Sequence, residues 1–377
     1  MPAITPFRVG IPQADLDDLH GRLDRVRWPG ELPGVGWDLG IPLERMQELT
    51  TYWREKFDWR AHEAALNQYP QYTTEIDGQN IHFLHVRSAN PRALPLILTH
   101  GWPGSVIEFG KVIGPLSDPA AYGDDAGGSF HVVCPSLPGY GFSGKPSKTG
   151  WGVGKIAEAW ETLMLSLGYD RYGAQGGDWG AAVSTQIGRN RGHCIAIHLN
   201  MPIARPAAGS GGDLTVDEQQ ALAAYAEHRQ WGTGYSKQQS TRPQTLGYGL
   251  VDSPVGQLAW IVEKFWAWTD CDGHPENAVS RDELLDNVML YWITGSGASS
   301  ARLYWESFNS FITDGRVELP TGVAAFPKEI LRTPRRWCEA VYNITHWTTM
   351  PRGGHFAAFE QPDLFVDDVR AFFATVR

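Results

Sequence analysis

Residues 176–180 read Gly-Gly-Asp-Trp-Gly and directly follow the apolar run from Tyr172 to Gln175. An aspartate among glycines after a buried strand predicts a tight strand-to-helix turn with the carboxylate of Asp178 at its apex. Such a carboxylate can attack a tetrahedral carbon and form an ester, which a second step must hydrolyse. The competing interpretation is a glycine-rich turn in which Asp178 only caps a helix.

Two further segments favour the catalytic interpretation. Residues 97–104 (Ile-Leu-Thr-His-Gly-Trp-Pro-Gly) predict a buried strand ending in a turn, and the amide of a residue in such a turn can bind an oxyanion. We therefore expect the backbone amides of Trp102 and Trp179 to stabilise a tetrahedral intermediate. His355 lies in Arg-Gly-Gly-His-Phe, between a predicted strand and a predicted helix, which is the position of a general base in this chain order.

A carboxylate is needed to orient His355, and the sequence offers two. Glu329 follows a short apolar stretch, residues 323–326, which we interpret as a strand. A carboxylate at that point can hold the imidazole and stabilise its charged form. Asp314 is the alternative, although the neighbouring Gly315 is typical of a surface turn.

Several phrases of the chain together resemble the microsomal-type epoxide hydrolases, and the similarity runs nearly from end to end. They are His-Gly-Trp-Pro-Gly-Ser from His100, Gly-Gly-Asp-Trp-Gly from Gly176, Asp-Ser-Pro-Val-Gly from Asp252, Asn-Val-Met-Leu-Tyr-Trp from Asn287, Phe-Pro-Lys-Glu at 326–329 and Arg-Gly-Gly-His-Phe-Ala-Ala-Phe-Glu from Arg352. The resemblance implies an enzyme that converts an epoxide and water to a vicinal diol without a metal or an organic cofactor.

The resemblance also implies roles for individual residues. Asp178 is the implied nucleophile, Glu329 the acid of the charge relay and His355 the base. The family has two tyrosines that activate the epoxide oxygen, and they map onto Tyr248 in Leu-Gly-Tyr-Gly-Leu and Tyr304 in Ala-Arg-Leu-Tyr-Trp. Phenols suit this task because opening an epoxide leaves an alkoxide that needs a hydrogen-bond donor or a proton.

The pattern of elements predicts an α/β-hydrolase core with a mostly parallel sheet, a helical cap insertion and an N-terminal helical meander. The meander is expected at residues 1–71, where Leu16, Leu19, Leu23 and Val26 repeat at helical spacing and a second helix covers about 43–57. The core is expected at 72–200 and 315–377, beginning with a hairpin turned at Asp77-Gly78. Residues 201–314, helical and aromatic with a Gly/Ser-rich stretch at 207–213, form the predicted cap.

Composition agrees with a soluble enzyme, and we expect a cytoplasmic location by default. The formal net charge is −10 and no run of Lys or Arg occurs, so we expect no nucleic-acid or membrane partner. The first ten residues lack an apolar segment of anchor length, unlike the membrane-bound relatives. The four cysteines are scattered, which predicts neither disulfides nor a zinc site.

Gly-Tyr-Gly-Phe-Ser-Gly at 139–144 is followed by Pro146 rather than a helix, so we reject a nicotinamide site.

Two other functions remain open. A haloalkane dehalogenase also uses an aspartyl ester, and the indole N–H groups of Trp102 and Trp179 could cradle a halide; the tyrosines argue against it, because a halide leaves without a proton. A ligand-binding protein on an inactive hydrolase scaffold is the other alternative, and the full set of Asp, Glu and His argues against it. For an epoxide hydrolase we expect a small apolar or aromatic substrate, a role in detoxification or natural-product biosynthesis, and by family similarity a homodimer.

Overall fold

A nine-stranded sheet forms the centre of the molecule in the computed structural model, which describes residues 2–123, 128–206, 214–308 and 315–377. The strand order is β1-β2-β3-β5-β4-β6-β7-β8-β9. The strands are β1 (Ile4–Phe7), β2 (Gln71–Ile76), β3 (Gln79–Val86), β4 (Leu94–Thr99), β5 (Phe130–Pro135), β6 (Tyr172–Gly176), β7 (Cys194–Leu199), β8 (Val317–Ala325) and β9 (Tyr342–Thr349). Strands β4 to β9 are parallel and the first three are antiparallel, which confirms the predicted mostly parallel sheet.

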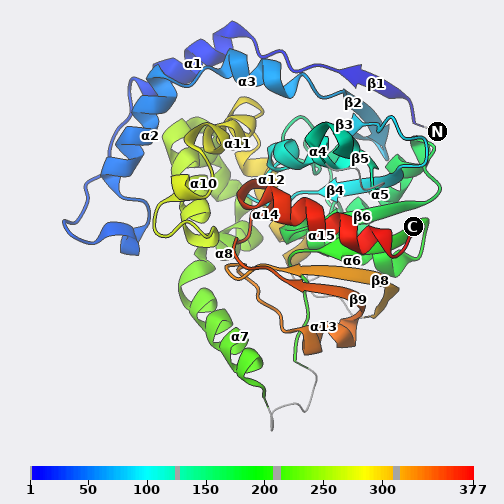
Figure 1. The fold of residues 1–377 in the computed structure, drawn as a ribbon. Coiled ribbons are helices and arrows are strands. Elements are labelled where there is room, and N and C mark those ends of the chain that lie inside the picture. Colours follow the sequence, from blue (N-terminus) through cyan, green and yellow to red (C-terminus); the bar gives the residue numbers. More distant parts are fainter. Residues whose placement is uncertain (1, 124–127, 207–213, 309–314) are drawn as a thin grey trace.

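Helices cover the sheet as expected for a parallel sheet with crossover connections (Figure 1). They are α4 (Gly110–Ser117), α5 (Val153–Ser166), α6 (Asp178–Asn190), α13 (Arg335–Val341), α14 (Ala357–Glu360) and α15 (Pro362–Ala374). Helix α4 packs against α15, and α5 against α6. A Cβ on Gly173 of β6 would lie 2.3 Å from the ring of Phe373, so the glycine lets α15 approach the sheet closely.

The chain between β7 and β8 forms a group of helices that we call the cap. Its helices are α7 (Val216–Glu227), η4 (His228–Gly232), α8 (Gly234–Thr241), α9 (Pro243–Asp252), α10 (Pro254–Trp268), η5 (Pro275–Asn277), α11 (Arg281–Ile293) and α12 (Gly297–Ser307). Figure 1 shows α7 extending away from the other cap helices. The Gly/Ser-rich stretch at 207–213 and Asp314 lie outside the described residues.

The segment before β2, which we call the meander, combines predicted and unpredicted elements. It contains β1, α1 (Gln13–Leu23), η1 (Gly36–Leu39), α2 (Leu43–Glu55) and α3 (Trp59–Leu66). The two predicted helices are present, although α1 ends before Val26. The sequence indicated neither α3 nor β1, which pairs antiparallel with β2 from Ile4 opposite Thr74.

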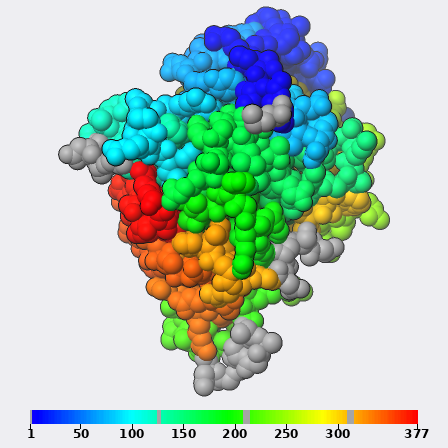
Figure 2. Space-filling view, turned by 90° about the vertical axis from the view of Figure 1, so that its right-hand side faces the viewer, coloured from blue at the N-terminus to red at the C-terminus, as the bar shows by residue number. Residues whose placement is uncertain are grey.

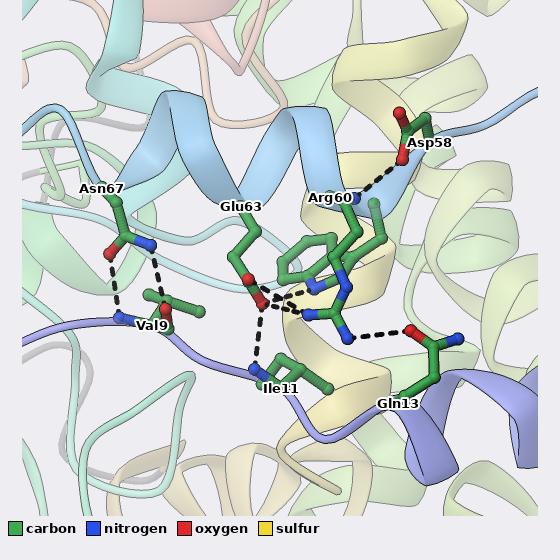
Figure 3. A network of polar contacts seen from close by, with 8 residues as sticks. Val9, Ile11, Gln13, Asp58, Arg60, Glu63 and Asn67 are labelled. Atoms are coloured by element: carbon green, nitrogen blue, oxygen red, sulfur yellow. Dashed lines mark hydrogen bonds and ion pairs between the residues drawn. The ribbon is translucent and has the colours of Figure 1, made fainter.

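Polar side chains of α3 fix the connection between β1 and α1 (Figure 3). The amide group of Asn67 makes two hydrogen bonds with the backbone of Val9, donating to its carbonyl and accepting from its N–H at 2.9 Å each. The Glu63 carboxylate accepts from the N–H of Ile11 at 2.9 Å and from the indole of Trp59 at 3.1 Å. These contacts hold an otherwise irregular segment against the rest of the chain.

The meander also contacts the cap. Tyr52 donates to a carboxylate oxygen of Asp282 at 2.7 Å, and His62 Nδ1 lies 2.8 Å from Asp286 Oδ1. Figure 2 shows the meander, in blue, lying across one end of the molecule. The meander is therefore attached to the cap through these two contacts and to the sheet through the pairing of β1 with β2.

The hairpin predicted between β2 and β3 is present. The hairpin of β2 and β3 turns at Asp77 and Gly78, with φ angles of 51° and 76° and Ile76 paired to Gln79, as predicted. All four cysteines are free and buried. Within the described residues, no helix combines the length and apolar character needed to cross a bilayer.

Strand β1 begins and α15 ends on the side of the molecule away from the cap (Figure 1).

Candidate active site

The turn that carries Asp178 joins β6 directly to α6. Asp178 has φ of 47°, in the left-handed region that costs energy for a residue other than glycine. A Cβ on Gly176 would lie 2.2 Å from the backbone of Gly180, and one on Gly180 would lie 1.8 Å from the carbonyl oxygen of Thr99. The flanking glycines are therefore required by close backbone approach, and the predicted strand-to-helix turn is confirmed.

The loop after β4 supplies a backbone donor to this carboxylate. The N–H of Trp102 donates to Asp178 Oδ1 at 2.8 Å, and both residues are buried. Cap helix α11 holds the loop in place, since Asn287 donates to the carbonyl of Pro103 at 2.7 Å and Tyr291 to that of Gly104 at 2.8 Å. Trp179 follows Asp178 directly in α6, and its amide as a second donor stays a prediction.

His355 and Glu329 meet Asp178 from the other end of the chain. His355 Nδ1 lies 2.6 Å from Glu329 Oε1, and His355 Nε2 lies 3.4 Å from Asp178 Oδ2. Burial lowers the pKa of His355, but the charges of Glu329 and Asp178 outweigh this and raise it well above its ordinary value. The arrangement places an imidazole between two carboxylates. An ester on Asp178 would remove one of the two charges that raise the pKa of His355, and so would leave the imidazole able to act as a base for hydrolysis of that ester.

The loop that carries His355 is fixed by one further carboxylate. Glu360, on α14, accepts from the N–H groups of Gly354 and Phe356 at 2.9 Å each and from that of Asp270 in the cap at 2.8 Å. The N–H of His355 itself donates to the carbonyl of Trp268, the last residue of α10, at 2.9 Å. The loop that carries His355 is thus connected to the cap at two points, through Glu360 to Asp270 and through its own N–H to Trp268.

The structure brings only one of the two expected tyrosines to the site. Tyr304, on α12, is buried, and its ring lies edge-on to that of Trp179 at 4.8 Å between centroids. Tyr248 instead is 69% exposed on α9, so its predicted place at the epoxide oxygen is not supported. Within this stretch Tyr248 and Gly249 lie on the exposed face of α9, whereas Gly247 and Leu250 are buried.

Tyr235, which the sequence did not single out, lies beside Tyr304 near Asp178. It begins the first turn of α8 and is buried, with its ring stacked on Trp102 at 5.0 Å and 5.8 Å from that of Tyr304. Burial and then the charge of Asp178 raise the pKa of Tyr235, while its hydroxyl's contact with that of Tyr304 lowers it. Burial also raises the pKa of Tyr304 well above its ordinary value. Both phenols are therefore neutral donors at ordinary pH.

Aromatic rings lie around Asp178 and His355. Trp268 lies edge-on to His355 at 5.1 Å, and Trp102 contacts the rings of both Tyr235 and Tyr304. Such rings offer apolar contact area, and the hydroxyls of the tyrosines add polar groups at defined points. The surroundings of Asp178 thus favour an apolar ligand that has one oxygen able to accept hydrogen bonds from the tyrosine hydroxyls.

Comparisons with known proteins agree with this architecture. A family model described as the epoxide hydrolase N terminus matches residues 4–109, and the α/β hydrolase fold matches residues 95–230. A Stigmatella aurantiaca protein assigned as an epoxide hydrolase is 51% identical, over 99% of this chain and 86% of its own length. Epoxide hydrolase 1 of Oryctolagus cuniculus is 38% identical, over 99% and 89%. The Aspergillus niger epoxide hydrolase structure superposes with a TM-score of 0.91 at 34% identity, covering 100% of this chain and 97% of that one.

The fold and the site define an α/β hydrolase with an aspartate at the strand-to-helix turn between β6 and α6. The length and identity of the matches narrow this class to one group. The chain belongs to the microsomal-type epoxide hydrolases.

Proposed function

We propose that this protein adds water to an epoxide and releases a vicinal diol through a covalent ester on Asp178. The observation that carries the proposal is the position of Asp178 at a strained turn, with the Trp102 amide on one carboxylate oxygen and His355 facing the other. Strain and a fixed hydrogen bond preorganise the carboxylate for attack.

In the first half-reaction a carboxylate oxygen of Asp178 bonds to one carbon of the epoxide and the carbon–oxygen bond of the ring breaks. Tyr235 and Tyr304 donate hydrogen bonds to the departing oxygen; one phenol passes its proton to this oxygen, which becomes a hydroxyl, and the phenol recovers a proton through water. We assign the second donor to Tyr235 rather than Tyr248, because Tyr235 is buried against Trp102 and Tyr304.

In the second half-reaction His355 takes a proton from water, and the water oxygen attacks the ester carbon of Asp178. Glu329 stabilises the imidazolium that results, through its 2.6 Å contact with Nδ1. The amide of Trp102, and that of Trp179 as we predict, stabilise the negative charge on the tetrahedral intermediate. The diol then leaves, and the Asp178 carboxyl group gives the proton left by the attacking water back to solvent, so that the carboxylate is restored.

The ring of aromatic side chains supports a small apolar or aromatic epoxide as the substrate, in detoxification or natural-product biosynthesis. We also propose a cytoplasmic protein, a homodimer, and a division into the meander at 1–71, the cap at 201–314 and a core from 72–200 and 315–377. A haloalkane dehalogenase is less well supported, since two buried phenols at the site serve an oxygen leaving group better than a halide.

Oxygen labelling tests the ester. Enzyme in excess over styrene oxide or an aliphatic epoxide, in ¹⁸O-water, should release mostly unlabelled diol in its first turnover and leave the label on the peptide containing Asp178. The reason is that the first diol takes its new oxygen from the carboxylate and solvent oxygen enters only at hydrolysis. Labelled diol in a verified single turnover, with an unlabelled peptide, would refute the proposal.

A further inference from the structure

A small polar cavity lies beside the carboxylate of Asp178 and the imidazole of His355. It leaves about 20 Å³ for the centre of a water molecule, and Glu108, Gln175 and Asn200 also line it. A cavity needs roughly 10 to 15 Å³ by this measure to hold one water. Its size therefore matches about one water molecule, next to the atoms at which the second half-reaction takes place.

The lining itself points to a water. Gln175 donates to Asn200 Oδ1 at 3.0 Å, while its own side-chain oxygen is buried and has no donor among the described residues. Buried polar atoms of folded proteins usually find a partner in protein or in ordered water. A water in the cavity would supply the missing donor.

Glu108 brings a third carboxyl group to this cavity, one that the two half-reactions do not use. It lies on η2 (Val106–Phe109), directly after the loop that carries the Trp102 amide. A Cβ on Gly104 would lie 1.4 Å from Glu108 Oε1, so only glycine at position 104 leaves room for the carboxyl group there. No residue of the described ranges forms an ion pair with Glu108.

Its surroundings keep this carboxyl group neutral. Burial raises the pKa of Glu108 to about 8; the charge of Asp178 adds to the rise, and His355 and the Ser105 amide oppose it. At neutral pH the group is therefore mostly a carboxylic acid, with one oxygen that accepts and one that donates. It can bind water without placing another negative charge beside Asp178.

We propose that this cavity binds the hydrolytic water and that Glu108 holds that water between His355 and the ester on Asp178. The water gives one proton to His355 Nε2 while its oxygen bonds to Cγ of Asp178. The bond from Cγ to the ester oxygen, which leaves with the diol, then breaks, and that oxygen takes the proton from His355. Glu108 accepts the other O–H of the water, so its own protonation is the same before and after. The inference rests on the ester mechanism proposed above.

The two half-reactions can be timed separately in single turnovers with styrene oxide, or the best epoxide of a small screen. Intact-protein mass measures the ester and chromatography measures the diol. Glu108→Leu should slow hydrolysis roughly ten-fold or more, with alkylation within about three-fold of wild type, so that the ester accumulates. Glu108→Gln should recover part of the loss, because its amide still accepts a hydrogen bond. Gly104→Ala should resemble Glu108→Leu, since the added methyl displaces the carboxyl group.

Ile107→Val, on the same turn, is the matched control and should leave the ratio of the two rates unchanged. A wild-type ratio in Glu108→Leu would overturn the inference while leaving the ester mechanism intact. If Glu108→Leu does not fold, as judged by circular dichroism, a wild-type ratio in Gly104→Ala overturns it instead. Failure to trap any ester, even with His355→Gln, would contradict the proposed function itself.

Discussion

Tyr235 and Tyr248 differ in burial far more than in sequence context. Each follows a glycine, and each lies in a short cap helix. Only tertiary packing distinguishes them, because Tyr235 stacks on Trp102 whereas Tyr248 is exposed. The choice of Tyr248 from a local phrase was therefore open to error, since the phrase says nothing about which cap helix faces the sheet.

Substitution of the two tyrosines tests this assignment. Tyr235→Phe and Tyr304→Phe should each slow alkylation roughly ten- to a hundred-fold, the effect of losing about 1 to 3 kcal/mol of hydrogen bonding to a developing alkoxide. Tyr248→Phe is the matched control and should alkylate at the wild-type rate. Rapid-quench measurement of the ester gives these rates. A large loss in Tyr248→Phe, with none in Tyr235→Phe, would restore the original choice.

Other residues of the site could be predicted from the sequence because local geometry determines their positions. Asp178 and His355 follow predicted strands, and the carboxyl ends of parallel strands meet at one edge of a sheet. Their place at one site was predicted from the order of nucleophile, acid and histidine along the chain, and this geometry accounts for it. Glu108 was missed, although it is the only charge in the apolar turn Val106–Phe109; an isolated carboxylate after a functional loop was the available signal.

At the level of elements, strand and helix positions followed from sequence wherever a segment was long and regular. The hairpin at Asp77 and Gly78 and the parallel strands were predicted from turn residues and apolar runs. Strand β1 was not, because four residues with no alternation of buried and exposed positions give no periodic signal. It is defined by pairing with β2, an interaction between residues about seventy positions apart.

The hydrogen bonds that Glu360 accepts predict that the loop around His355 depends on this carboxylate. In Glu360→Gln an NH₂ group replaces one of the oxygens that accept from Gly354, Phe356 and Asp270, so at least one of these hydrogen bonds becomes a contact between donors. We expect faster amide hydrogen exchange in the peptide around His355, and hydrolysis slowed more than alkylation. Asp363→Asn, on the next helix, is the control. Unchanged exchange in Glu360→Gln would show that the loop does not depend on this carboxylate.

For the whole molecule, the ion pair of His62 with Asp286 joins the meander to the cap and should depend on pH. The hydrogen bond with Asp286 raises the pKa of His62, against the lowering effect of burial. A raised pKa means that the contribution of the pair to the free energy of unfolding is complete below about 6.5, the unfolded value, and is lost as the pH rises through the folded value.

His62→Gln should therefore destabilise the protein at about pH 6 and have a smaller effect at about pH 9. Urea unfolding of both proteins at each pH measures the difference. His20→Gln, on α1 and away from Asp286, should show no such dependence. An equal loss of stability at both pH values in His62→Gln would mean that packing, and not charge, makes the contact with the cap.

The position of the chain ends has a practical consequence for any use of the protein on a solid support. Because β1 begins and α15 ends on the side away from the cap, an affinity tag or surface linker at either end would project from the face opposite the catalytic groups (Figure 1). Attachment through the termini should leave substrate access open. Attachment through surface groups of the cap would instead place the support against the elements that carry Tyr235 and Tyr304.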